Sequence, residues 1–189
     1  GTTIDNQTDR GCMLDDRSLI DRLKQGDREA LRVVYMTYKD VLLTLAFSMV
    51  HDMNAAEDIL HDVFVSFAGC VGELELRTSL RKYLIGSVLN RARDRFRRNK
   101  THAIEAEDFQ PAMRISTDPE QTAALSEETR RLSDALTRLP LEQREVILLR
   151  LNAGLRFKQI AEVQKTSVPT VQGRYRYGID KLRTVLGGG

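Results

Sequence analysis

The polar groups best placed to recognise another molecule lie near the end of the chain, in 168–186. Apolar positions recur there every three or four residues and predict an inward helical face: Val171, Tyr175, Gly178, Leu182 and Leu186. The outward positions are Thr170, Gln172, Gly173, Arg174, Arg176 and Tyr177. Arginine and glutamine can hydrogen-bond to guanine and adenine edges, and the major groove of DNA admits one helix. The segment therefore predicts a helix that reads duplex DNA.

A second, shorter helix must hold that reading helix in place. The preceding segment has one apolar face at helical spacing: Phe157, Ile160, Ala161 and Val163. A polar turn follows, and the Ser167 hydroxyl can then accept an N–H from the first turn of the second helix. Pro169 lies in that first turn, where its missing donor costs little. Two short helices joined by a tight turn predict a helix-turn-helix.

A second basic segment lies in the middle of the chain. Thr78 or Ser79 can start a helix that runs to about Arg98. Its polar positions are Arg81, Lys82, Asn90, Arg91, Arg95 and Arg98. With Tyr83 and Phe96 among them, these groups suit phosphate contacts and base stacking. A solubilising basic face with two core aromatic residues fits the same pattern equally well.

The N-terminal part reads as packed helices. Two helices are predicted within 14–49, separated by Gly26 and Asp27. Asn54 and Glu57 then predict a capped start for a third helix. Its inner face would hold Ile59, Leu60, Val63, Phe64 and Phe67, and its outer face Glu57, Asp58, His61 and Asp62. The outer face is either solvated or a docking surface for another protein.

Charge is distributed in blocks although the net charge is only +2. A basic run at 91–100 is followed by an acidic stretch and then by the basic end of the chain. This order indicates two modules that face nucleic acid, with an acidic segment between them. The residues 101–128 lack periodicity and carry Pro111 and Pro119, which predicts a flexible linker.

Several classes of protein are disfavoured. No apolar run reaches membrane-spanning length, no signal peptide is visible, and 1–12 reads as a frayed terminus. Cys12 and Cys70 form no disulfide framework, and the three histidines are scattered, so no metal or other cofactor is expected. An enzyme is the least favoured class, because neither a nucleophile–base set nor a phosphate-binding glycine loop is present.

Together the motifs resemble a bacterial RNA polymerase sigma factor of the extracytoplasmic-function (ECF) group of the sigma-70 family. The N-terminal resemblance runs through 56–64, 79–84 and 90–98, and the C-terminal one through 136–146, 160–162 and 170–174. The resemblance implies an all-α protein of two small helical domains: a region 2 bundle at 14–100 and a region 4 helix-turn-helix at 125–186. A flexible acidic linker at 101–124 would join them.

The resemblance also implies partners and roles. Core RNA polymerase would bind Asp58, His61, Asp62 and Phe64. The melted −10 strand would meet the 72–77 loop and Arg81, Lys82, Tyr83, Asn90, Arg91 and Arg95. Duplex −35 DNA would meet Thr170, Gln172, Gly173, Arg174, Arg176 and Tyr177. Such a protein would be cytoplasmic and non-catalytic, would not insert into a membrane, and would commonly be restrained by an anti-sigma factor.

Several positions depart from the family's pattern. Tyr83 stands where a tryptophan is common, and Tyr177 and Ile179 replace positions that are often basic. Lys165 replaces the usual turn glycine, which predicts a reshaped turn, because positive φ costs a non-glycine residue about 1 kcal/mol. Gly173 and Gly178 lie inside the reading helix, where they would permit close approach of DNA and of another helix, respectively.

Two rival functions stay open. A helix-turn-helix repressor or response-regulator output domain would bind duplex DNA without polymerase, and 54–98 would then serve dimerisation or ligand binding. A sigma-like decoy would act by binding an anti-sigma protein.

Overall fold

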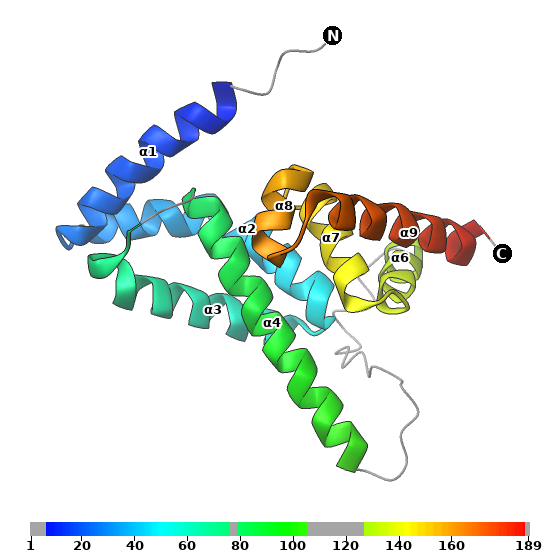
Figure 1. The fold of residues 1–189 in the computed structure, drawn as a ribbon. Coiled ribbons are helices and arrows are strands. Elements are labelled where there is room, and N and C mark those ends of the chain that lie inside the picture. Colours follow the sequence, from blue (N-terminus) through cyan, green and yellow to red (C-terminus); the bar gives the residue numbers. More distant parts are fainter. Residues whose placement is uncertain (1–6, 76–78, 106–126, 188–189) are drawn as a thin grey trace.

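The computed structural model describes residues 7–75, 79–105 and 127–187, with side chains at 16–75, 79–98 and 131–187 (Figure 1). This part of the chain is helical and contains no strand. The N-terminal unit consists of α1 (Gln7–Lys24), α2 (Arg28–Val50), α3 (Met53–Cys70), the short 3-10 helix η1 (Val71–Glu73) and α4 (Leu80–Glu105). The C-terminal unit consists of α6 (Glu127–Thr137), α7 (Leu141–Leu151), α8 (Phe157–Gln164) and α9 (Val168–Gly187).

Caps and turns fix the start of α2 and α3. Gly26, at φ +80°, separates α1 from α2, which confirms the predicted break. The Asp27 carboxylate then accepts the Glu29 and Ala30 N–H groups at 2.9 and 3.3 Å. The cap predicted at Asn54 is wrong: Asp52 accepts the Ala55 N–H at 3.0 Å, so Asn54 already lies within α3. Either side chain can cap, and the helix starts two residues earlier than expected.

α2 is the central helix of the N-terminal unit. It packs against α1, α3 and α4, and also against α7 of the C-terminal unit. By length and composition it could cross a membrane. Its apolar side, however, is buried by the neighbouring helices, as Val34, Leu42 and Leu45 are fully enclosed. That burial identifies α2 as the core helix of a folded bundle.

A buried carboxylate links three helices of this bundle. Asp16 of α1 is 3% exposed, and its Oδ2 accepts the backbone N–H of Leu80 at 2.8 Å, at the start of α4. Its Oδ1 accepts the Tyr38 hydroxyl of α2 at 3.3 Å. A buried carboxylate needs such donors, so Asp16 fixes where α4 begins relative to α1 and α2. Ser79 adds a weaker local cap by accepting the Lys82 N–H at 3.4 Å.

α4 is longer than the sequence indicated. The expected end was near Arg98, but the helix continues to Glu105 and its last turns extend away from the bundle (Figure 1). Residues 101–105 of the expected linker are therefore helical. The rest of that linker, from 106, lies outside the described residues.

The C-terminal unit packs α9 across α7, with α6 and α8 beside them. A Cβ added at Gly178 would lie 2.8 Å from Ile147 Cδ1, so the close helix contact predicted there is confirmed. Val171 and Leu182 are buried as expected. Leu186 is 46% exposed, so its predicted inward position is wrong, because it lies in the last turn of α9, beyond the last buried residue.

The two units touch one another. α2 contacts α7, and α4 contacts α8, so the reading module lies against the N-terminal bundle (Figure 1). Residues far apart in the sequence thereby share one surface.

Candidate nucleic-acid and polymerase interfaces

The turn between α8 and α9 contains a residue in the left-handed conformation, and this residue is a lysine rather than a glycine. Lys165 adopts φ 51° and ψ 49°, and the Thr166 N–H donates to the Ala161 carbonyl at 3.0 Å. The prediction of a reshaped turn is therefore wrong. Lysine accepts a conformation that costs a non-glycine residue about 1–2 kcal/mol. The helix-turn-helix geometry is kept at that cost.

Short-range contacts then orient α9. Ser167 Oγ accepts the Thr170 N–H at 3.3 Å, which confirms the predicted cap. The Phe157 and Tyr175 rings meet edge to face at 5.4 Å between centroids and join α8 to α9. The Arg150 guanidinium lies 5.3 Å from the Phe157 ring and extends the cluster to α7. The reading helix is therefore held by aromatic contacts that join it to α8 and, through Arg150, to α7.

Most of the predicted −35 residues are accessible on α9. Thr170, Gln172, Arg176 and Tyr177 are exposed, whereas Gly173 and Arg174 are half-buried. The Arg176 guanidinium stacks over the Tyr177 ring at 5.0 Å and donates to its hydroxyl at 3.4 Å. A Cβ added at Gly173 would meet nothing within 4 Å, so packing within the protein does not require glycine there.

Arg174 differs from its neighbours because it is already engaged. Its Nη1 donates to Gln164 Oε1 at 2.8 Å, at the end of α8. Gln164 Nε2 in turn donates to Glu145 Oε2 at 2.8 Å, on α7. Glu145 is 1% exposed and receives Arg93 of α4 through Nε and Nη2, each at 2.5 Å. A continuous polar chain therefore links α9 to α4.

The predicted polymerase residues of α3 do not share one environment. Asp58, His61 and Asp62 are exposed. Phe64 is only 9% exposed, and its ring meets Tyr35 edge to face at 4.9 Å. Phe64 thus belongs to the core of the bundle, although it lies within the motif that carries the resemblance.

Two of these carboxylates pair with predicted −10 residues. Arg91 Nη1 lies 3.3 Å from Asp62 Oδ2, and Arg91 also donates to the Asp62 carbonyl and to Ser66 Oγ. Arg95 Nη1 lies 3.7 Å from Asp58 Oδ2. These pairs are substantially exposed, and exposed ion pairs contribute about 0–1 kcal/mol. Another charged group can therefore replace either the arginine or the carboxylate of each pair.

The remaining predicted −10 residues point in different directions. Lys82 Nζ lies 2.9 Å from Glu162 Oε2 of α8, and Arg81 reaches towards Gly154 of the same unit. Tyr83 faces Cys70 and Phe67, and burial with the Cys70 hydrogen bond raises the pKa of its phenol to about 12. Asn90 is exposed. The structure therefore does not bring these six residues onto one open face.

A groove between the two units collects several of these groups. Its volume is about 680 Å³, and α4, α7, α8 and α9 form its walls. Its lining residues are Asn90, Arg93, Asp94, Arg97, Leu141, Glu142, Glu145, Gln164 and Arg174. Asn90, predicted for −10 DNA, and Arg174, predicted for −35 DNA, thus line the same groove.

Buried polar groups form a second contact between the units. Arg144 of α7 is 1% exposed and donates to the Leu136 and Thr137 carbonyls at 2.9 and 2.8 Å, and to Met49 O of α2 at 3.4 Å. His51, at the end of α2, shares a 2.7 Å hydrogen bond between Nδ1 and Ser133 Oγ of α6. Its Nε2 is buried and lacks a hydrogen-bond partner among the described residues. Burial, together with the nearby Arg144 charge, lowers the pKa of His51 to about 4.

The sequence analysis did not identify Arg93, Glu145, Gln164 or His51. Glu145 lies on the buried face of α7, and a carboxylate at an apolar helical position is a signal that could have been noticed. Its partner Arg93 lies 52 positions away, and no local pattern indicates that pairing.

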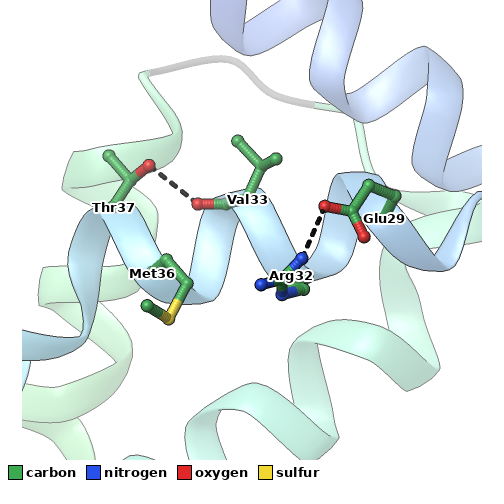
Figure 2. A pocket seen from close by; sticks show the side chains of 5 residues that line it. All are labelled: Glu29, Arg32, Val33, Met36 and Thr37. Atoms are coloured by element: carbon green, nitrogen blue, oxygen red, sulfur yellow. Dashed lines mark hydrogen bonds and ion pairs between the residues drawn. The ribbon is translucent and has the colours of Figure 1, made fainter.

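A second hollow lies on the exposed side of α2. Its lining residues are Glu29, Arg32, Val33, Met36 and Thr37 (Figure 2). Glu29 pairs with Arg32 at 3.1 Å, and Thr37 donates to the Val33 carbonyl at 2.7 Å, so its polar groups are satisfied locally. Elsewhere, no group of three metal-ligating side chains occurs among the described residues.

Comparison with known proteins gives a consistent pattern. The sigma-70 region 2 family model matches residues 34–102, and the sigma-70 region 4 model matches residues 129–182. The ECF RNA polymerase sigma factor SigX of Bacillus subtilis is 28% identical over 160 residues, covering 82% of each chain.

Solved structures share the fold. CnrH in complex with the cytosolic domain of CnrY superposes with a TM-score of 0.70 at 24% identity, covering 92% of this chain and 97% of CnrH. The sigma factor RpoE in complex with the anti-sigma factor NepR from Bartonella quintana gives a TM-score of 0.65 at 18% identity, covering 82% and 96%.

Proposed function

The chain belongs to the sigma-70 family of RNA polymerase sigma factors, in its ECF group, and we propose that it directs core RNA polymerase to promoters by recognising −10 and −35 elements. The observation that carries this proposal is the presence of both DNA-facing modules, regions 2 and 4, in order on one chain. The protein acts by binding polymerase and DNA. It works in the cytoplasm, where polymerase and promoter DNA are found.

Core polymerase binds the outer face of α3. Asp58, His61 and Asp62 are exposed there and can meet basic groups of polymerase. Phe64 supports this face from the core rather than touching polymerase. Because the ion pairs of Asp58 and Asp62 with Arg95 and Arg91 are exposed, polymerase can replace the arginines with little loss.

The melted −10 strand binds along α4. Asn90 is already accessible, and Arg91 and Arg95 become available when polymerase takes over their carboxylate partners. Arg81 and Lys82 become available when the C-terminal unit moves away, because both now reach towards it. Tyr83 is half-buried and positions α4 against α3.

The −35 duplex binds α9. Thr170, Gln172, Arg176 and Tyr177 are exposed at its N-terminal half, which is the part of a recognition helix that reads bases. Arg176 stacked on Tyr177 presents a guanidinium in a defined orientation, suited to paired hydrogen bonds with guanine. Gly173 leaves the helix surface open beside them.

Control by an anti-sigma factor follows from the family and from the relative solved with NepR. The anti-sigma protein competes with polymerase or DNA for the described faces.

Run-off transcription with purified core polymerase on fragmented DNA of the source genome tests the function. Transcripts are expected only when the chain is added, and their start sites should share upstream −10 and −35 sequences. Duplex binding with no transcript from any fragment would reject the function in favour of a regulator that acts without polymerase.

A further inference from the structure

The carboxylate of Glu145 is the centre of the contact between the two units. It is almost completely buried, and both of its oxygens accept hydrogen bonds: Oε1 from Arg93, and Oε2 from Arg93 and Gln164. A buried carboxylate is tolerated only when it is paired and hydrogen-bonded. Arg93 therefore contributes strongly to the closed arrangement, since it is the cationic partner and comes from the other unit.

Gln164 transmits this contact to the reading helix. Its Nε2 donates to Glu145, which leaves its Oε1 as an acceptor facing Arg174. The Arg174 guanidinium is consequently held against α8 and half-buried, in contrast to the exposed Arg176 on the same helix. A DNA base or phosphate that binds Arg174 breaks its hydrogen bond to Gln164. That bond is the last one in the polar chain that begins at Arg93.

The closed arrangement cannot serve both promoter elements at once. Elements centred 10 and 35 base pairs before the start site are roughly 85 Å apart along duplex DNA, at about 3.4 Å per base pair. Asn90 and Arg174 nevertheless line a single groove of about 680 Å³. The units must therefore separate for both elements to be bound at once.

The other hydrogen bonds between the units can be remade with water, and separation also exposes apolar side chains, because the buried hydrophobic residues of both units form one cluster. Lys82 pairs with Glu162 at a partly exposed position, and His51 bonds Ser133. Arg144 keeps its two shorter bonds to carbonyls of its own unit if the units part.

We propose that Arg174 has two competing uses, and that the chain Arg93–Glu145–Gln164–Arg174 couples −35 recognition to separation of the two units. Closing lowers the affinity of α9 for DNA, and DNA bound by Arg174 weakens the closed state by the same factor, because linkage is reciprocal. Glu145 and Gln164 act as positioning residues for Arg174. This inference rests on the proposed function of α9.

The test uses the full chain and a 20-base-pair duplex selected from a random library on that chain. Arg93→Met breaks the polar chain at its α4 end, where Arg93 meets Glu145. It should raise duplex affinity about 5-fold or more, which is the lower end of typical coupling between sites. Arg93→Lys should give an intermediate value. The matched control is Arg97→Met, which removes the same charge one turn along α4 from an exposed residue paired with Asp94 of its own helix.

A double-mutant cycle separates coupling from a general effect on folding. In a Gln164→Met background, Arg93→Met should no longer change duplex affinity, because the link to Arg174 is already broken. X-ray scattering should show a larger radius of gyration for free Arg93→Met than for Arg97→Met. Circular dichroism should show equal helix content in all variants.

The possible outcomes separate failure of the coupling from failure of the proposed function. Equal duplex affinity of the Arg93→Met and Arg97→Met variants, or an undiminished Arg93→Met effect in the Gln164→Met background, would overturn the coupling and leave the proposed function standing. Failure to select any duplex, with no duplex binding by any variant, would reject the DNA-reading role of α9 and the coupling with it.

Discussion

The two DNA-facing regions of this protein differ in how their residues are held. On α9, Arg176 is oriented by the adjacent Tyr177, and the helix start is set by Ser167, three residues before Thr170. On α4, Arg91 and Arg95 are paired with α3, and Lys82 is paired with α8. Under the proposed function, most of the reading helix would be ready for DNA, whereas the middle helix would offer its cations only after their present partners have been exchanged.

That difference fits the two proposed DNA targets, duplex DNA for α9 and a melted strand for α4. Duplex DNA has a fixed shape, so a rigid helix surface can match it before binding. A melted strand exists only after polymerase has opened the promoter, so early exposure of its binding groups has no benefit. Surface ion pairs suit this delay, because each contributes little and can be replaced by another charged group.

Among the changes that test this comparison, charge reversal on α3 should have the largest effect, which is on binding to core polymerase. The double variant Asp58→Lys, Asp62→Lys should abolish co-purification with core polymerase, because both exposed carboxylates would become repulsive towards basic polymerase groups. Asp21→Lys, which reverses an exposed carboxylate on α1 outside this face, is the control and should bind core. Unchanged co-purification of the double variant would place the polymerase interface elsewhere.

Acidification should act on the contact between the units through His51. Its pKa falls from 6.5 in the unfolded chain to about 4 here, so the unfolded state binds the extra proton between these values. Stability is therefore fully present above about pH 6.5 and decreases towards pH 4, by up to about 3 kcal/mol at 1.36 kcal/mol per pKa unit.

Denaturant unfolding at several pH values measures this loss. His51→Asn should remove most of the pH dependence, because asparagine tolerates the left-handed conformation at this position and does not titrate. His61→Asn, at an exposed position of α3, should keep the wild-type profile. A profile that is identical in all three proteins would exclude His51 as the responsible group.

Substitutions at two glycines of α9 test whether its packed face and its outer face differ in their tolerance of a side chain. Gly178→Leu should destabilise the protein by about 1–3 kcal/mol, because even a Cβ would lie 2.8 Å from Ile147 Cδ1. Gly173→Leu should not destabilise the free protein and could add about 0.5–1 kcal/mol through helix propensity, while weakening duplex binding. Thermal melting and duplex titration distinguish the two faces, and equal melting temperatures would show that the packing at Gly178 can relax.

The smallest expected effect concerns the orientation of Arg176. Tyr177→Leu removes the ring beneath its guanidinium and should reduce duplex affinity by about 0.5–1 kcal/mol, the value of an exposed cation–π contact. Arg176→Ala should cost about 1–3 kcal/mol if the guanidinium contacts a base. A larger effect for Tyr177→Leu than for Arg176→Ala would mean that the tyrosine itself contacts DNA.

Sequence reasoning succeeded where the signals are local. The spacing of Phe157, Ile160 and Val171 and the Ser167 cap predicted the helix-turn-helix, and the break at Gly26 was also predicted. It failed at Asn54 and Lys165, where two local choices compete. Asp52 caps as well as Asn54, and a lysine in a left-handed turn is sustained by the helices on either side.

The amino-acid sequence by itself determined that the chain is all-helical with a reading helix near its end, because helical periodicity and caps act over a few residues. Its motifs carried the resemblance to the sigma-70 family. Tertiary structure alone decided that Asp16 fixes the start of α4 and that Arg93 meets Glu145. These two pairings join residues 64 and 52 positions apart, and the direction in which a side chain points across such a separation depends on how whole helices pack.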